Sequence, residues 1–147
     1  MGVTIDNILT VSSTPRNRLL TDVLALTGIV ERAGQGMDVI FRLTLSEGKQ
    51  TPDYEKSDDY QVVAILSSIV KDPGFALFIK SIQQELPENQ KLSVFDILTF
   101  CAIKEGRQPF DKDIAKKLLA MGYLEKRGKT TAIRYIPVSY THLRAHE

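Results

Sequence analysis

Residues 14–40 read TPRNRLLTDVLALTGIVERAGQGMDVI, and this stretch predicts two consecutive helices. Thr14 is a favourable N-cap, and Pro15 suits the first helical position because it has no N–H group to leave unpaired. Gly28 can adopt the left-handed conformation that ends a helix. The apolar side chains of this first helix recur at the spacing of one helical face, which predicts a stripe directed at the core: Leu19, Leu20, Val23 and Leu24.

The second helix is predicted to begin at Gly34-Gln35-Gly36 and to end near Gly48. Its inward positions follow the spacing i, i+3, i+4, i+7, i+8 and are Met37, Ile40, Phe41, Thr44 and Leu45. The polar segment Lys49–Asp59 contains Pro52 and predicts a loop. Tyr60–Leu66 is apolar and β-branched, which predicts a strand buried on both faces.

The two helix starts together indicate a surface for an anion such as a phosphate. Arg16 and Arg18 are predicted in a first helical turn, where cations oppose the helix dipole unless an anion lies beside them. The N–H groups of a glycine-rich helix start can also cradle phosphate. The alternatives stay open: both arginines can point outward or pair with Glu31 or Asp22, and two glycines before a helix are commonly a turn and a cap. The chain has no G-x-x-x-x-G-K-[ST] motif, so it is no P-loop.

Three short pieces of this region carry a resemblance to a known family. They are Pro15-Arg16-Asn17, Gly28-Ile29-Val30-Glu31 and Gly34-Gln35-Gly36-Met37. Together they are similar to the distal part of the ATP-binding module in bacterial RecG-like, Schlafen-type (AlbA-containing) proteins, which read R-N-x-x-L…G-L-I-E-x-x-G-x-G-I. The resemblance covers roughly residues 2–66, and one departure is Arg18, where the family usually has proline.

The resemblance implies a nucleotide site, because such modules are related to the GHKL ATPases. On that analogy Gly34 and Gly36 approach the phosphates, with Arg16 and Asn17 beside them, and the cofactor of the intact parent protein is ATP with Mg²⁺. The family's upstream helix, whose asparagine helps to hold the magnesium, has no match here. We therefore expect a C-terminal fragment that binds no nucleotide unaided, and an enzymatic role only for the parent.

The second half of the chain predicts three helices followed by a β-hairpin. The helix starts are marked by Asp72-Pro73, Ser93 and Asp111. Tyr123–Arg127 and Thr131–Ile136 predict two strands, joined by Gly128-Lys129-Thr130. This order of elements is the outline of a winged helix, a variant of the helix-turn-helix.

A winged helix places its third helix in the major groove of DNA and its hairpin against the flanking backbone. The cations that would make these contacts are Lys112, Lys116, Lys117, Lys126, Arg127, Lys129 and Arg134. Because no Asn or Gln accompanies them, they favour phosphate contacts over base reading, and binding should depend strongly on salt. The alternative is a protein-interaction or dimerisation module with a solvated basic face and no affinity for nucleic acid.

These patterns predict an α+β chain with a partial GHKL-like module at residues 1–66 and a winged helix at residues 67–137. Residues 138–147 are expected to be a non-native tail, because SYTHLRAHE resembles adapter read-through. Charge divides in the same way: residues 1–66 have six Lys or Arg against nine Asp or Glu, and residues 71–137 have twelve against eight. Such a basic block can mark contact with nucleic acid, as expected for an ATP-binding, DNA-associated transcriptional regulator or RecG-like helicase-related protein.

Composition excludes several other classes. The longest uncharged apolar run, around residues 62–70, is too short to cross a membrane. Cys101 is the only cysteine and both histidines lie in the last six residues, which argues against a zinc site and against a Ser-His or Cys-His catalytic unit. A single cysteine also fits a reducing cytoplasm, where we expect the protein to act, and assembly into a homo-oligomer stays open.

Overall fold

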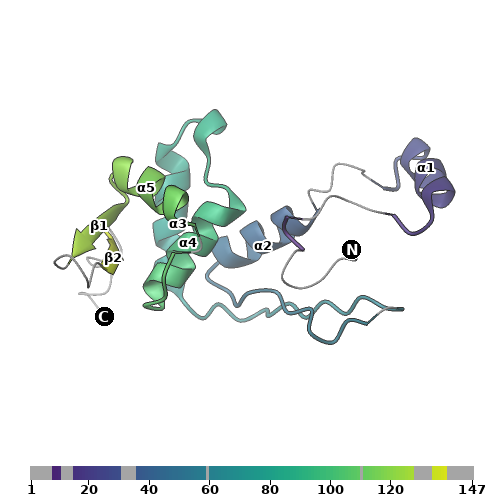
Figure 1. Cartoon of the computed structure of the whole chain (residues 1–147), viewed down its shortest axis with the longest axis horizontal. Coiled ribbons are helices and arrows are strands. Elements are labelled where there is room, and N and C mark those ends of the chain that lie inside the picture. Colours follow the sequence, from purple (N-terminus) through teal and green to yellow (C-terminus); the bar gives the residue numbers. More distant parts are fainter. Residues whose placement is uncertain are drawn as a thin grey trace.

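The computed structural model describes residues 8–10, 15–30, 36–58, 60–109, 111–127 and 134–138. Within these ranges the chain forms helices and one small antiparallel sheet (Figure 1), which confirms the predicted α+β class. The elements are α1 (Arg18–Leu26), α2 (Gly36–Ser46), α3 (Pro73–Glu85), a 3₁₀ turn (Glu88–Gln90), α4 (Val94–Lys104), α5 (Lys112–Ala120), β1 (Leu124–Arg127) and β2 (Arg134–Pro137). None of the helices in the described ranges combines the length and apolar character needed to span a bilayer.

Helices α3, α4 and α5 begin at the capping residues that the sequence predicts. The Asp72 carboxylate accepts a hydrogen bond from the Phe75 N–H at 2.8 Å. Ser93 Oγ accepts from the Asp96 N–H at 3.2 Å, and the Asp96 carboxylate accepts from the Ser93 N–H at 2.8 Å, which is a reciprocal capping box. Asp111 caps α5 by accepting from the backbone N–H two residues further on.

The core lies between α3 and α4 and is closed by α5 and β1. Its fully or nearly fully buried side chains are Phe75, Phe78, Ile79, Ile82, Ile97, Phe100, Ile103, Leu118 and Leu124. The rings of Phe78 and Phe100 meet edge to face with centroids 5.2 Å apart, a favourable arrangement for two aromatic side chains. Apart from Leu124, which lies on β1, these core residues recur at helical spacing in the sequence.

Strands β1 and β2 form the predicted antiparallel pair, with Leu124 opposite Pro137 and Arg127 opposite Arg134. Residues 128–133, which include the predicted turn and the start of the second predicted strand, lie outside the described residues. Val138 donates its N–H to the Tyr123 carbonyl at 3.2 Å. Residues 139–147 of the expected tail also lie outside the described residues.

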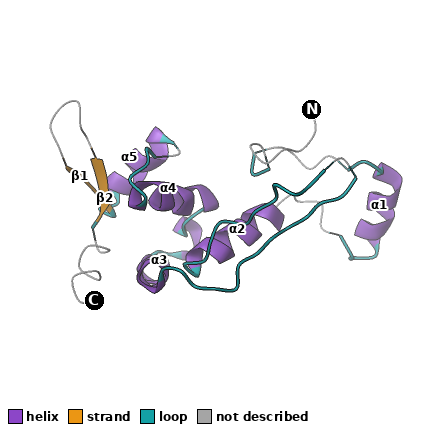
Figure 2. Ribbon diagram, turned by 90° about the horizontal axis from the view of Figure 1, so that it is seen from below, coloured by secondary structure: helices purple, strands orange, loops and turns teal. Residues whose placement is uncertain are grey.

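Helix α2 packs against α3 and α4, as Figure 2 shows. Leu45 enters the main core, and Phe41 stacks on Tyr54 with ring centroids 6.2 Å apart. The helix ends at the predicted place, because Gly48 has a φ of 68° and a Cβ there would lie 2.2 Å from the Asp72 carbonyl oxygen. Elements on both sides of residue 66 therefore share one core, and the predicted domain boundary at that residue stays a prediction.

The start of α1 and its surroundings differ from the prediction. The N-cap is Asn17, whose Oδ1 accepts from the Leu20 N–H at 3.0 Å, and Arg16 precedes the helix. Most of the predicted inward stripe is exposed instead, with Leu19 80% exposed, and Leu24 is half-buried. Figures 1 and 2 both show α1 standing away from the packed helices. Gly28 ends the helix with a φ of 72°, as predicted. The spacing thus identified an amphipathic helix, but no other described element covers its apolar face.

The predicted buried strand Tyr60–Leu66 is wrong. Ile65 makes an isolated bridge with Asp53, and Tyr60 is 96% exposed. Sequence preference alone does not make a strand, because a strand needs a neighbour to accept and donate its hydrogen bonds. Among the described residues this segment pairs in the manner of a strand only at this bridge, and Val63 exchanges its backbone hydrogen bonds with the Ser57 hydroxyl instead.

Candidate nucleic-acid interface

Helix α5 presents two of the predicted cations to solvent. Lys112 and Lys116 are both exposed and lie four residues apart, on the same side of the helix. The Lys116 ammonium lies 2.7 Å from Oδ1 of Asp113. The hydrogen bond and charge of Asp113 raise the pKa of Lys116, and a smaller contribution comes from Tyr135 on β2. The same pairing lowers the pKa of Asp113. Lys116 therefore stays protonated, and its charge is paired with the Asp113 carboxylate on the same helix.

Lys117 lies differently from its neighbour. Its ammonium is 2.9 Å from both carboxylate oxygens of Asp96, which is 1% exposed at the start of α4. About half of the Lys117 side chain stays accessible to solvent. Sequence reasoning missed Asp96, although Ser-x-x-Asp at positions 93–96 has the spacing of a capping box and could have indicated it.

The sheet adds further cations beside α5. Lys126 and Arg127 are exposed on β1, and the Arg127 guanidinium lies 3.9 Å from the Glu125 carboxylate. Arg134 pairs with Arg127 in the antiparallel ladder. Lys129 lies outside the described residues. The structure thus brings α5 and β1 into contact, with exposed basic residues on each.

The predicted phosphate site is divided in the structure. Asn17 uses its side-chain oxygen to cap α1, and Arg16 is exposed just before that helix. Gly36 opens α2, where a Cβ would meet nothing within 4 Å, so packing does not require glycine there. Gly34 lies outside the described residues. Because α1 stands away from α2 in both views, the described residues do not form a closed nucleotide cradle (Figures 1 and 2). The assignment of these four residues to ATP stays a prediction.

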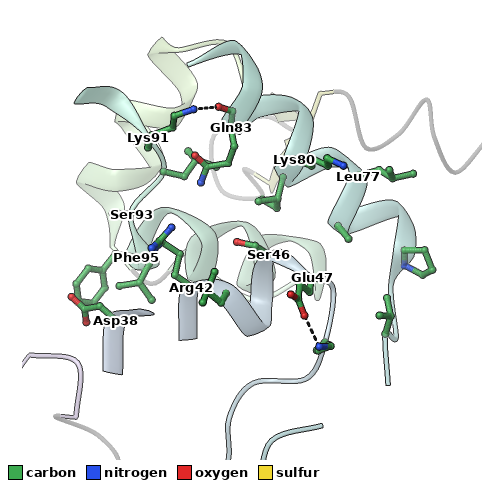
Figure 3. A pocket seen from close by; sticks show the side chains of 18 of the residues that line it. Asp38, Arg42, Ser46, Glu47, Leu77, Lys80, Gln83, Lys91, Ser93 and Phe95 are labelled. Atoms are coloured by element: carbon green, nitrogen blue, oxygen red, sulfur yellow. Dashed lines mark hydrogen bonds and ion pairs between the residues drawn. The ribbon is translucent and has the colours of Figure 1, made fainter. Parts of the chain in front are cut away.

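A groove of about 1450 Å³ runs between α2, α3 and the start of α4. Figure 3 shows Arg42 and Ser46 of α2 facing Leu77 and Lys80 of α3 across it. Leu43 and Leu77 are exposed apolar side chains of its lining. Among the described residues, Arg42 and Lys80 have no ion-pair partner. No pattern in the sequence indicates this groove, because it forms only when α2 packs on α3.

Comparison with known proteins links only the upstream part of the chain to a family. Residues 1–66 match the model of the family described as "Putative ATP-dependent DNA helicase recG C-terminal". Searches of curated proteins and of solved structures find no match to the chain. Residues 1–66, which contain α1 and α2, are therefore similar to a RecG-related ATPase region.

Proposed function

We propose that residues 67–137 form a winged helix that binds duplex DNA chiefly through its phosphates. The observation that carries this proposal is the contact of α5 with β1, which gathers exposed lysines and an arginine beside one sheet. The contacts are assigned to Lys112, Lys116, Lys126, Arg127, Lys129 and Arg134. Lysine and arginine neutralise phosphates without reading bases, so the binding is weakly selective for sequence.

We further propose that the chain acts as part of an ATP-binding, DNA-associated regulator or helicase-related protein. Support comes from the family match of residues 1–66 and from the exposed apolar face of α1. Another polypeptide segment can pack on this face. On this proposal, ATP with Mg²⁺ binds only when that segment completes the nucleotide site formed by Arg16, Asn17, Gly34 and Gly36.

Fluorescence anisotropy of the whole chain with a labelled duplex tests the DNA role. We expect binding at low salt that weakens steeply as salt is added, because phosphate contacts release counterions. Lys116→Glu and Arg127→Glu should each weaken binding at least tenfold. Lys56→Glu makes the same charge change at an exposed site on the segment between α2 and α3, and it should have little effect. No binding by the wild-type chain at low salt would reject the proposal.

A second candidate function is a protein-interaction module without nucleic-acid affinity. The groove between α2 and α3 favours it, because Leu43 and Leu77 leave apolar surface exposed between two cations that have no ion-pair partner among the described residues. Sedimentation velocity distinguishes the two candidates. If this candidate is correct, the chain should self-associate as its concentration rises, and Leu77→Asp should abolish that association. The chain should also show no binding to DNA.

A further inference from the structure

We infer that Lys117 is a positioning residue that fixes helix α5 for DNA binding, and that it is not itself a phosphate contact. This inference rests on the proposed DNA-binding function. The sequence alone places Lys117 among the DNA contacts, because it does not distinguish adjacent lysines of a basic helix by their ion-pair partners. The structure shows that partner and changes the role of Lys117.

Asp96 is a buried carboxylate that is hydrogen-bonded to Ser93 and Lys117. It accepts from the Ser93 N–H and from the Ser93 hydroxyl, both at 2.8 Å, and from the Lys117 ammonium at 2.9 Å. Among the described residues, Lys117 is the only cation within ion-pairing distance of Asp96. A buried carboxylate that loses its one cation is strongly destabilised, so moving Lys117 onto a DNA phosphate would leave an unpaired charge in the protein.

The two charges also sit at favourable ends of their helices. Asp96 is in the first turn of α4, where the helix dipole stabilises an anion, and Lys117 is in the last turn of α5, where it stabilises a cation. The ion pair therefore ties the start of α4 to the end of α5. Because α4 is the most buried helix of the core, it provides a rigid anchor for α5.

This anchor determines which lysines face DNA. Successive residues of an α-helix are turned by about 100°, so a helix whose Lys117 points at α4 turns Lys116 away from it. Lys112 lies four residues before Lys116 and points to nearly the same side. Both of these lysines are exposed, as this rotation requires. Lys117 thus contributes by holding α5 at one rotation, and Lys112 and Lys116 supply its positive charge to the phosphates.

Anisotropy titrations over a range of salt concentrations separate the two roles. Loss of one phosphate contact reduces the slope of log K against log salt by about 1, and we expect this for Lys116→Gln. Lys117→Gln should leave the slope unchanged and weaken binding roughly tenfold through a loosened α5. Asp96→Asn should produce the same loss, and the double variant should be no weaker than either single variant, because both changes break one interaction.

Three results would overturn the inference while leaving the DNA-binding function intact. They are a slope reduced by about 1 in Lys117→Gln, an affinity increased in Asp96→Asn because Lys117 is released, and additive losses in the double variant. Failure of the wild-type chain to bind DNA would instead remove the proposed function and this role with it.

Lysine acetylation of the wild-type protein provides a test that does not depend on the folding of any variant. The acetylation rate of each lysine is measured in the absence and in the presence of duplex DNA. The rates of Lys112 and Lys116 should be lower in the complex, whereas the rate of Lys117 should be the same in both. Protection of Lys117 by DNA comparable to that of Lys116 would contradict the positioning role.

Discussion

At the scale of single residues, Tyr54 is a buried phenol whose hydroxyl has no hydrogen-bond partner among the described residues. A buried polar group without a partner is destabilising, so Tyr54→Phe should leave stability unchanged or raise it by about 1 kcal/mol at neutral pH. Urea unfolding measures this. Tyr60→Phe is the matched control, since Tyr60 is almost fully exposed and its hydroxyl stays in water.

The stability of the folded chain should also depend on the ionisation of Tyr54 at alkaline pH. Burial raises the pKa of Tyr54 above its ordinary value of 10.0. Below pH 10 the phenol is neutral in the folded and in the unfolded chain, so its ionisation does not lower the free energy of unfolding there. As pH rises above 10 the unfolded chain loses the proton first, and stability falls. The phenylalanine variant should lose less stability than the wild type at alkaline pH, and an identical loss in both proteins would contradict the burial of this group.

Cys101 is predicted to be unreactive in the folded protein. Burial raises the pKa of its thiol to about 11, and the nearby Lys104 offsets only part of that effect. The reactive thiolate is therefore scarce at pH 8. A chromogenic disulfide reagent should react slowly with the native chain and rapidly in denaturant. Rapid reaction of the native protein at pH 8 would show that α4 opens readily at this position.

At the scale of elements, α1 and α5 are helices of equal length whose contributions to stability should differ sharply. Leu118 of α5 is fully buried, so Leu118→Ala should lower the free energy of unfolding by about 2–5 kcal/mol. Leu26 of α1 is 89% exposed, so Leu26→Ala should change it by less than about 0.5 kcal/mol. Chemical denaturation of the two variants measures both values. A large loss for Leu26→Ala would show that α1 packs against the rest of the chain in solution.

The same contrast explains what the sequence could predict. Helix starts at Asp72, Ser93 and Asp111 are local features, because a cap needs only residues two or three positions away, and all three were predicted correctly. The placement of the α1 stripe and of Tyr60–Leu66 depends on a covering element elsewhere, and both predictions were wrong in the same way. The groove and the Asp96–Lys117 pair also join distant segments, so neither was predicted.

The pairing within α5 leads to a prediction about DNA affinity. Asp113 is exposed and neutralises Lys116 at 2.7 Å, which opposes the approach of a phosphate. Asp113→Asn should release Lys116 and strengthen DNA binding by a few-fold at low salt, if the proposed interface is correct. Glu55→Gln removes the same charge from an exposed site on the segment between α2 and α3 and serves as the control. An equal gain in both variants would indicate an effect of net charge alone.

At the scale of the whole molecule, the charge asymmetry should orient the chain on DNA. Residues 1–66 have three more acidic than basic side chains, whereas residues 71–137 have four more basic than acidic ones. In the proposed complex, phosphates repel the negative region, so we expect the surface of α5 and the sheet to face the duplex. Six cations are assigned to the interface, which predicts a slope of log K against log salt of about −5.

Because these contacts read phosphates, duplexes of unrelated sequence should bind with affinities within a few-fold of each other. Titrations of two such duplexes at several salt concentrations check the slope and the selectivity together. A slope near −1 would mean that most of the assigned cations stay in solvent when DNA binds. A hundredfold preference for one duplex would mean that side chains of α5 other than its lysines reach the base edges. A bidentate base contact contributes about 1–3 kcal/mol of discrimination between bases, whereas lysines on phosphates contribute almost none.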